Sequence, residues 1–362
     1  MNTIVPLEFY NPIYYQFLFG IVLMIAANSF STNITTPNGI KFTKAISGIS
    51  LIYILLMMGL RPISYYFGDM GTYNNYFERY QSGAEIIQLK DGFFYAFMKF
   101  CSNFMSAQAF FFLCAFLYII PVYLACKKWF TNYWGYGFLM IISILTFWAY
   151  GTNGIRNGLA TSIFIYALSK DKLLFKALWM FVALNFHTSI LLAIFAYIIV
   201  YFKNTPSLYL KIWFIAIPLS LIGGSFWETF FLGFGFEEQR MQEYLGNTDY
   251  AEQFSQTGFR WDFLLYSSTG VFAGYYYIFK KKFIDKNYLV IYQIFLITNA
   301  FWILVIRAGF SNRFAYLSWF LLGLVIIYPL IKKKFLNNQH PKIGLIILGS
   351  FLFTYILEVI LK

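Results

Sequence analysis

The feature that most constrains this chain is a succession of apolar runs, most of them long enough to cross a membrane. A helix that rises about 1.5 Å per residue needs roughly 20 residues to span a hydrocarbon core of about 30 Å. The runs cover approximately residues 13–30, 45–60, 107–126, 134–149, 155–169, 173–201, 210–222, 263–279, 288–306, 314–331 and 343–361. They predict an all-α fold, a polytopic integral membrane protein with about 11–12 transmembrane segments.

The composition agrees with this prediction and excludes several classes of protein. Apolar residues make up 60% of the chain and charged residues only 12%, whereas soluble domains have about 25% charged residues. No linker, repeat or low-complexity segment divides the sequence, so residues 1–362 are expected to form a single polytopic membrane domain. No phosphate-binding loop or dinucleotide fingerprint is present, and the two histidines, His187 and His340, are too few for a multi-histidine metal site. We expect no metal and no cofactor.

The net charge of +12 is distributed as membrane topology requires. The basic residues stand in short clusters between apolar runs, which is the positive-inside pattern and not a basic face for nucleic acid. Membrane lipids are therefore the expected surroundings, with no nucleic-acid partner. The lysines that mark cytoplasmic loops are Lys41, Lys44, Lys127, Lys128, Lys170, Lys172, Lys280, Lys281, Lys282, Lys286, Lys332, Lys333, Lys334 and Lys342. The N-terminus is expected outside.

The run over residues 173–201 conflicts with this alternation if it crosses only once. A single crossing would put Lys203 and Lys211 outside and would invert every later lysine cluster. The sequence therefore predicts a broken segment that goes in and comes back, with the break around NFHTS. Irregular backbone at that depth is tolerated only where protein or water covers it, so the break predicts a cavity at His187.

The same topology leaves two external loop regions, approximately residues 61–106 and 223–262, and places every arginine outside. Arginine presents a rigid fork of donors that binds phosphate oxygens through two bonds. Arginines gathered at one membrane surface therefore indicate a lipid-linked phosphate or diphosphate. Arg156 and Arg313 are the first candidates for this ligand, followed by Arg307 and Arg260, whereas Arg61, Arg79 and Arg240 are expected to snorkel or to pair with acids of their own loops.

Five motifs in order give a family resemblance. They are GDMGTYNNYFE, GTNGIRNGLA, NFHTSILL, GFRWDFLLYS and SNRFAYLSWFL. Together with the apolar runs they make the chain resemble the EpsG-like branch of the Wzy-type polymerases that build O-antigen, capsule and exopolysaccharide. The resemblance implies a glycosyltransferase that joins oligosaccharide repeat units carried on undecaprenyl pyrophosphate. It also implies action at the outer, periplasmic face of the bacterial inner (cytoplasmic) membrane, with a chain-length regulator and a flippase of the same pathway as partners.

Glycosyl transfer from a diphosphate requires a base for the acceptor hydroxyl and a stabilised leaving group. His187 and Asp69 are the candidate bases. His187 could instead be a buried polar group bonded to Asn185 or to a backbone carbonyl, and Asp69 a helix cap or an ion-pair partner of Arg61. The external loops are rich in Tyr, Asn and charged residues, a composition that suits a glycan-binding surface. The candidate glycan-binding residues are Tyr73, Tyr76, Asn153, Asp262 and Tyr316.

Two other functions stay open. A flippase for lipid-linked oligosaccharides would also use arginines and a polar cavity, although such transporters are often built from repeated halves, which this sequence lacks. A membrane O-acetyltransferase acting on the glycan would need a donor path from the cytoplasm.

Overall fold

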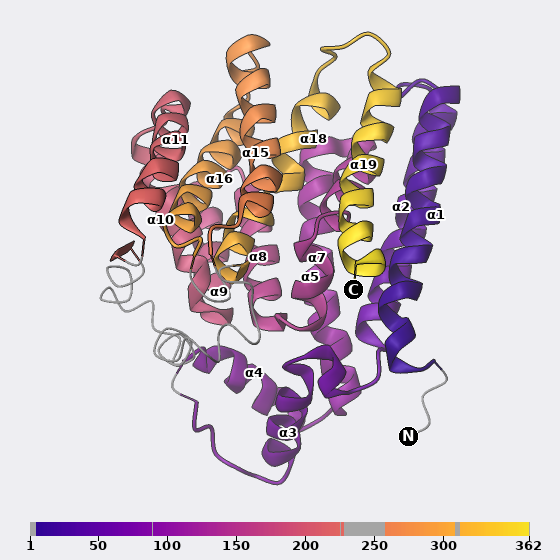
Figure 1. Cartoon of the computed structure of the whole chain (residues 1–362). Helices are drawn as coiled ribbons and strands as arrows, with labels where there is room; N and C mark the ends of the chain where they lie inside the picture. The colour runs from indigo at the N-terminus through magenta and orange to yellow at the C-terminus, as the bar shows by residue number, and fades with distance from the viewer. Residues whose placement is uncertain (1–4, 89, 225, 228–257, 308–311, 362) are drawn as a thin grey trace. The chain divides into compact units, whose positions relative to one another are not determined.

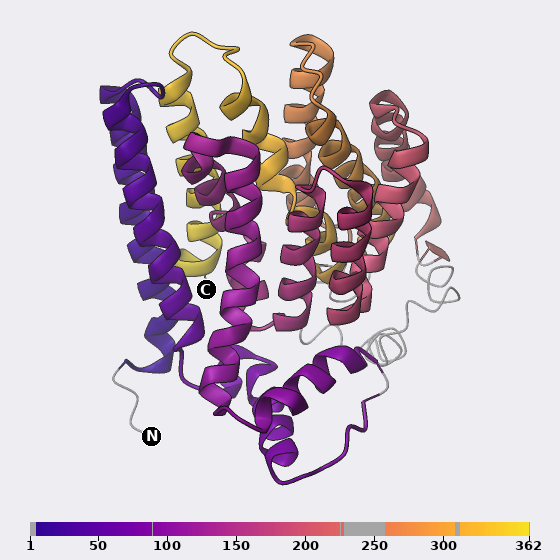
Figure 2. The same cartoon turned by 180° about the vertical axis from the view of Figure 1, so that it is seen from behind.

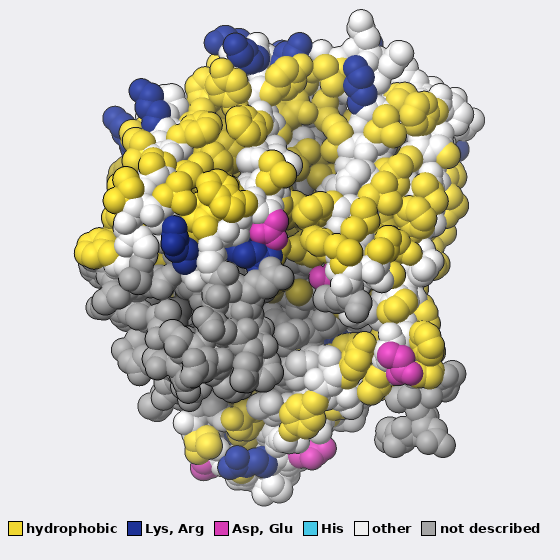
Figure 3. Space-filling model, in the orientation of Figure 1, with side chains coloured by type: hydrophobic (Ala, Val, Ile, Leu, Met, Phe, Trp, Pro, Cys, Tyr) yellow, Lys and Arg dark blue, Asp and Glu magenta, His cyan; other side chains and the backbone are white. Residues whose placement is uncertain are grey.

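The computed structural model describes residues 5–88, 90–224, 226–227, 258–307 and 312–361, and it has two compact units. Unit 1 is formed by Met1–Leu191 and Ile327–Lys362, and unit 2 by Leu192–Ile326. Within the described residues the regular elements are all helical, which confirms the predicted fold class (Figure 1). Seven apolar stretches of these residues are long enough to cross a membrane, so the protein is a multi-pass membrane protein. Hydrophobic side chains cover much of the visible helix surface, as contact with lipid requires (Figure 3).

The helices of unit 1 are α1 (Tyr10–Ser31), α2 (Pro37–Gly59), α3 (Met70–Gln81), α4 (Gly92–Ser102), α5 (Ala107–Phe130), α6 (Trp134–Ile142), α7 (Thr146–Thr152), α8 (Ile155–Leu168), α9 (Leu173–Phe186) and α19 (Gln339–Tyr355). Unit 2 contains α11 (Pro206–Gly223), α15 (Trp261–Tyr275), α16 (Lys286–Leu304), α17 (Asn312–Trp319) and all but the first residue of α10 (Leu191–Phe202). Helix α18 (Leu322–Lys332) runs from unit 2 into unit 1.

The run predicted as one segment over residues 134–149 is not one helix. It divides into α6, which ends at Ile142, and α7, which begins at Thr146 and continues to Thr152. The nine residues of α6 rise only about 14 Å, roughly half the thickness of a hydrocarbon core. Nearly all side chains of this stretch are buried inside the protein, and that interior position is what permits a helix to stop at membrane depth.

Lysine-rich loops meet at one end of unit 1. Lys44 Nζ donates to Asn132 Oδ1 at 2.7 Å, and Lys128 Nζ lies 2.6 Å from Asp171 Oδ2. These contacts join the N-terminal part of α2 to the loop after α5, and the end of α5 to the loop before α9. Figures 1 and 2 show α3 and α4 at the opposite end, where α1 begins. The lysine loops and the region 61–106 therefore lie at opposite ends of unit 1, as predicted, and the assignment of these ends to the cytoplasm and the outside stays a prediction.

His340 is a buried residue of α19 at this lysine end. Its ring nitrogens lie 2.5 Å from the Tyr136 hydroxyl and 2.7 Å from the Thr32 carbonyl oxygen. Tyr136 in turn accepts a hydrogen bond from Thr43 at 2.9 Å. The imidazole thus fastens α19 to the ends of α1, α2 and α6.

Within unit 2, α11 and α16 run parallel. Gln293 Nε2 donates to Asn204 Oδ1 at 2.6 Å, and Trp213 Nε1 donates to Asn299 Oδ1 at 2.7 Å, so the contacts advance along both helices in the same direction. Both helices therefore begin at one end of unit 2. This arrangement confirms that Lys203 lies at the same end of unit 2 as Lys286, the last lysine of the cluster over residues 280–286, as the charge pattern predicted.

A polar network inside unit 2 explains part of two sequence motifs. Asn299 Nδ2 donates to Ser267 Oγ at 3.1 Å and to Ser318 Oγ at 2.9 Å, and Trp319 Nε1 donates to Ser267 Oγ at 2.7 Å. All four side chains are fully buried. Because unpaired polar groups are costly in a membrane helix, this network joins α15, α16 and α17 through hydrogen bonds.

The predicted break around NFHTS is confirmed. Helix α9 ends at Phe186, and His187 has extended backbone with φ −159° and ψ 130°. A single 3-10 turn, η4 (Thr188–Ile190), then leads into α10.

The sequence predicted that Arg61 snorkels or pairs with an acid of its own loop, and the structure shows neither arrangement. It is only 1% exposed, and its guanidinium donates to the carbonyl oxygens of Met58 and of Thr152, the latter at 3.0 Å. These carbonyls belong to the last turns of α2 and α7, whose C-terminal ends carry partial negative charge. Burial lowers the pKa of Arg61 to about 10, so the guanidinium stays protonated at neutral pH.

We predict that Arg61→Leu lowers the thermal stability of the purified protein. The substitution leaves two helix-terminal carbonyls without their charged donor, and each such bond contributes about 1.5–3 kcal/mol. Melting followed by intrinsic fluorescence should show a fall of several degrees, whereas Arg79→Leu on the exposed surface of α3 should change it little. An unchanged melting temperature in Arg61→Leu would show that the carbonyls do not depend on this arginine.

Candidate functional site

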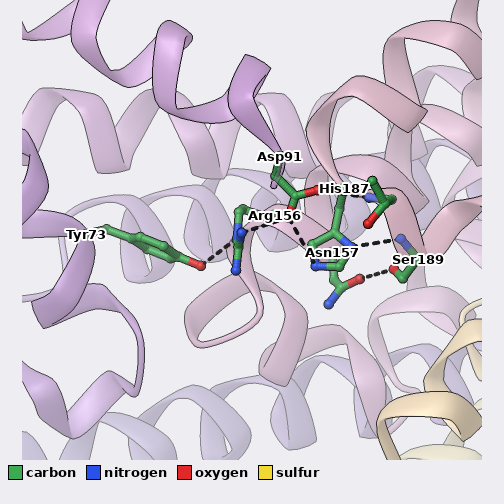
Figure 4. Close-up of polar contacts among 7 residues, drawn as sticks. Tyr73, Asp91, Arg156, Asn157, His187 and Ser189 are labelled. Atoms are coloured by element: carbon green, nitrogen blue, oxygen red, sulfur yellow. Dashed lines mark hydrogen bonds and ion pairs between the residues drawn. The ribbon is translucent and has the colours of Figure 1, made fainter. Parts of the chain in front are cut away.

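Arg156 is the centre of a polar cluster in unit 1, in the first turn of α8 at the end opposite the lysine loops (Figure 4). Its Nε donates to the Tyr73 hydroxyl at 2.9 Å, and its Nη1 donates to Asp91 Oδ2 at 2.7 Å. The rings of Tyr73 and Tyr95 each lie 5.7 Å from its Cζ. The side chain keeps 21% of its surface exposed, so the guanidinium is aligned by protein groups and still accessible.

Asp91 is a residue of this cluster that the sequence did not predict. Its side chain is only 4% exposed. Besides the bond from Arg156 it accepts one from the backbone N–H of Thr188 at 3.0 Å, and it faces His187 Nε2 at 3.7 Å. Asp91 thus joins α4, the start of α8 and the break after α9. The sequence offered one signal, an Asp-Gly pair before an apolar run, but that pattern indicates a helix start and nothing more.

The backbone of Asp91 is unusual for a residue with a side chain. Its φ of 53° and ψ of 36° lie in the left-handed region, which costs a non-glycine residue about 1 kcal/mol or more. Asp91 also stands at the N-cap of α4, where an aspartate ordinarily accepts a bond from its own helix, yet its side chain forms no capping bond. The carboxylate is committed to Arg156 and Thr188 instead.

His187 has both ring nitrogens directed at protein groups. Nδ1 accepts a hydrogen bond from the backbone N–H of Ser189 at 3.0 Å, so the ring proton of the neutral imidazole is on Nε2, toward Asp91. Ser189 Oγ donates to Asn157 Oδ1 at 2.5 Å, which ties the turn to α8. Asn185, the partner considered from the sequence, donates to the Phe181 carbonyl at 2.8 Å.

Asp69 lies beside the same cluster, one helical turn before Tyr73. It occupies the N-cap position of α3, but its side chain forms no capping bond. Its backbone N–H donates to Asn153 Oδ1 at 3.1 Å. Gly68 permits this contact, because its φ is 63° and a Cβ there would lie 2.0 Å from Asn153 Oδ1. The structure thus brings GDMG and GTNG together.

The tyrosines of the cluster are protonated. Burial raises the pKa of Tyr73 well above the ordinary value for a tyrosine, Arg156 opposes the rise, and Asp69 adds to it. Burial likewise raises the pKa of Tyr95. Tyr76, a predicted glycan residue, packs edge-on against Tyr95 with ring centroids 5.6 Å apart. The Tyr73 hydroxyl therefore accepts from Arg156 and keeps its own proton for a further acceptor.

The other predicted ligands of the diphosphate belong to unit 2. Arg260 is held by Asp262 through two bonds, Nε to Oδ1 at 2.9 Å and Nη2 to Oδ2 at 2.6 Å. Arg307 lies 5.8 Å from the Phe259 ring. Tyr316 packs against Trp319, and the side chain of Arg313 lies outside the described residues, as does Arg240. The meeting of Arg156 and Arg313 at one ligand stays a prediction.

Comparison with known proteins supports the resemblance found in the sequence. The EpsG family model matches residues 44–362, a range that includes all five motifs. No curated protein and no solved structure gave a match. The chain belongs to the EpsG family, and it is a multi-pass membrane protein of a family associated with exopolysaccharide synthesis.

Proposed function

We propose that this protein is a Wzy-type polysaccharide polymerase that joins oligosaccharide repeat units carried on undecaprenyl pyrophosphate. The observation that carries the proposal is Arg156, an accessible guanidinium that is fixed by Tyr73 and Asp91 at the end of unit 1 away from the lysine loops. A prealigned fork of this kind suits a diphosphate. With lysine loops facing the cytoplasm, the cluster faces the outside of the bacterial cytoplasmic membrane.

The reaction requires no nucleotide, because the carrier linkage is already activated. A hydroxyl at the non-reducing end of the acceptor unit attacks the anomeric carbon of the donor chain, and the bond from that carbon to the diphosphate oxygen breaks. The hydroxyl proton passes to a base, and undecaprenyl pyrophosphate leaves with the negative charge. Arg156 would stabilise that charge as it develops.

The carboxylate of Asp69 is our candidate for the base. His187 is less suited, because its Nδ1 accepts a bond from the Ser189 N–H and its Nε2 then presents an N–H to Asp91 and not a lone pair. Asp69 lies one helical turn before Tyr73, whose hydroxyl accepts a bond from Arg156. A proton taken by Asp69 is therefore close to the diphosphate that would leave at Arg156. Arg313, Arg307 and Arg260 are proposed for the second phosphate. Tyr73, Tyr76, Asn153, Asp262 and Tyr316 are proposed for the glycan.

His187 then has a supporting role, and this can be tested by substitution. Asparagine is a favoured N-cap residue, so His187→Asn should keep an acceptor for the Ser189 N–H and retain polymer output within about threefold of wild type. His187→Ala removes the acceptor, which costs about 1 kcal/mol, and should lower output by roughly fivefold. Polymer per molecule of purified protein is the measurement. A hundredfold loss in His187→Asn, with normal melting, would instead make the imidazole the base.

Surface polysaccharide in a deletion strain separates a polymerase from a flippase. Loss of a polymerase should leave single repeat units on the cell surface, whereas loss of a flippase should leave none. An O-acetyltransferase would leave polymer of normal length without its acetyl groups. Polymer of wild-type length in the deletion strain would contradict the proposal. Restoration by the intact gene, and not by an Arg156→Ala copy expressed equally, is the matched control.

The proposed partners follow from the same reaction. A flippase must deliver the lipid-linked units to the outer face, and a chain-length regulator would act on the growing polymer.

A further inference from the structure

The carboxylate of Asp91 and a phosphate oxygen are alternative acceptors for the Nη1 donor of Arg156. Asp91 Oδ2 lies 2.7 Å from Arg156 Nη1. Carboxylate and phosphate oxygens bind a guanidinium in the same planar geometry. A diphosphate that binds Arg156 through this donor must therefore displace the Asp91 side chain.

The local structure of Asp91 shows a side chain held away from its usual partner. Its backbone is left-handed, and its carboxylate gives up the cap of α4 for Arg156 and Thr188. The protein thus keeps a conformation of higher energy in order to place an anion on this arginine.

The surroundings allow the carboxylate to leave while α4 stays in place. Phe93 and Phe97 of α4 pack against Phe186 of α9, with ring centroids 5.2 Å and 6.0 Å apart. These apolar contacts do not depend on Asp91. Residues 84–88 and 90, which precede Asp91, are not helical. Residue 89 lies outside the described residues. Displacement of the carboxylate therefore needs no movement of the helix.

We propose that Asp91 is a displaceable counter-anion, a positioning residue that aligns Arg156 between reactions and competes with the diphosphate for it. The inference rests on the proposed function for the identity of the ligand, a polyprenyl diphosphate. Competition has two consequences. Arg156 is neutralised while the site is empty, so weaker anions such as phospholipid headgroups are disfavoured. After transfer, the carboxylate reclaims Arg156 and helps to expel the product diphosphate.

Asp91→Asn separates this role from a structural one. Binding of a sugar-free polyprenyl diphosphate to purified protein in neutral-lipid nanodiscs should become about tenfold tighter, because the competing charge is gone. Turnover should fall severalfold, because the product diphosphate is released more slowly, and KM should fall with it. A structural residue would weaken binding and turnover together. The matched control is Glu85→Gln on the same connection, whose exposed carboxylate pairs with Lys99 at 2.8 Å, and it should change neither quantity.

Hydrogen exchange in the wild-type protein tests the proposal without relying on the variant. Added polyprenyl diphosphate should speed exchange at the Thr188 amide, which loses its bond to Asp91, and in the connection before α4. Slower exchange there, or unchanged or weaker binding by a folded Asp91→Asn protein, would overturn the proposal. Equal competition by phosphatidylglycerol would overturn the choice of a diphosphate as ligand.

The outcomes also separate this inference from the proposed function. If Asp91→Asn tightens diphosphate binding but the wild-type protein makes no polymer, the counter-anion stands and the polymerase fails. If polymer forms but Asp91→Asn does not tighten binding, the polymerase stands and the counter-anion fails.

Discussion

Arg156→Lys should reduce polymer formation by about a hundredfold while the protein still folds. Removal of one preorganised donor to a developing oxyanion costs about 10²–10³ in rate. In the structure, Nε and Nη1 of Arg156 bond to Tyr73 and Asp91, and this pairing fixes the plane of the fork. A lysine ammonium is a point charge, and it cannot bind the Tyr73 hydroxyl and also present an aligned fork of donors to a phosphate.

The measurement is the distribution of chain lengths made by purified protein from lipid-linked repeat units, at equal protein amounts. Arg79→Lys is the matched control, because Arg79 is an exposed residue of α3 in the same external region. It should give the wild-type distribution. A normal distribution in Arg156→Lys would show that charge alone is enough there, and the diphosphate would have to bind elsewhere.

Asp69→Asn should lower the rate of transfer by about 10²–10⁴, the usual contribution of a positioned general base. The substitution keeps the size of the side chain and removes its ability to take a proton. The bond from Asp69 to Asn153 uses the backbone N–H, which the substitution keeps. Binding of lipid diphosphate should stay within about twofold of wild type, because the interaction with Arg156 is unaffected.

Glu78→Gln is the control for this experiment. Glu78 is an exposed carboxylate on the same helix, where it accepts a bond from Asn74 at 2.7 Å. Single-turnover transfer between two lipid-linked units is the measurement. If Asp69→Asn transfers at the wild-type rate, then either another group takes the proton or no side chain does. The His187 series then distinguishes between these cases.

Some of the site was readable from the sequence because its residues interrupt long apolar runs. Arg156 and His187 stand where hydrocarbon would otherwise continue, and ionisable groups at such depth cost at least about 2.5–3.5 kcal/mol. The break at His187 followed from charge counting alone, because each crossing reverses the side of every later loop. The first signal lies within a single apolar run, and the second is a count of charges along the chain. Neither depends on the tertiary structure.

Asp91 illustrates what the sequence leaves open. It lies in a loop with other acids, and in an external loop a carboxylate usually faces water. Its partner Arg156 is 65 residues away in sequence, and Thr188 is 97 residues away. The partners of Arg61 were likewise not predictable from the sequence. Its two acceptors are backbone carbonyl oxygens, and every residue type has such a carbonyl. Side-chain identity therefore gives no sign of these contacts.

The sequence by itself determined that this chain is an all-helical membrane protein, that the lysine loops within each unit share an end, and that the helix breaks at His187. Those properties depend on the cost of burying polar and charged groups in lipid, which is summed residue by residue. Tertiary structure decided that α6 and α7 stop short of a full crossing, that Arg61 caps two helices, and that Asp91 holds Arg156 beside His187. Such contacts depend on how distant segments approach one another, and that geometry is fixed only when the helices of unit 1 pack together.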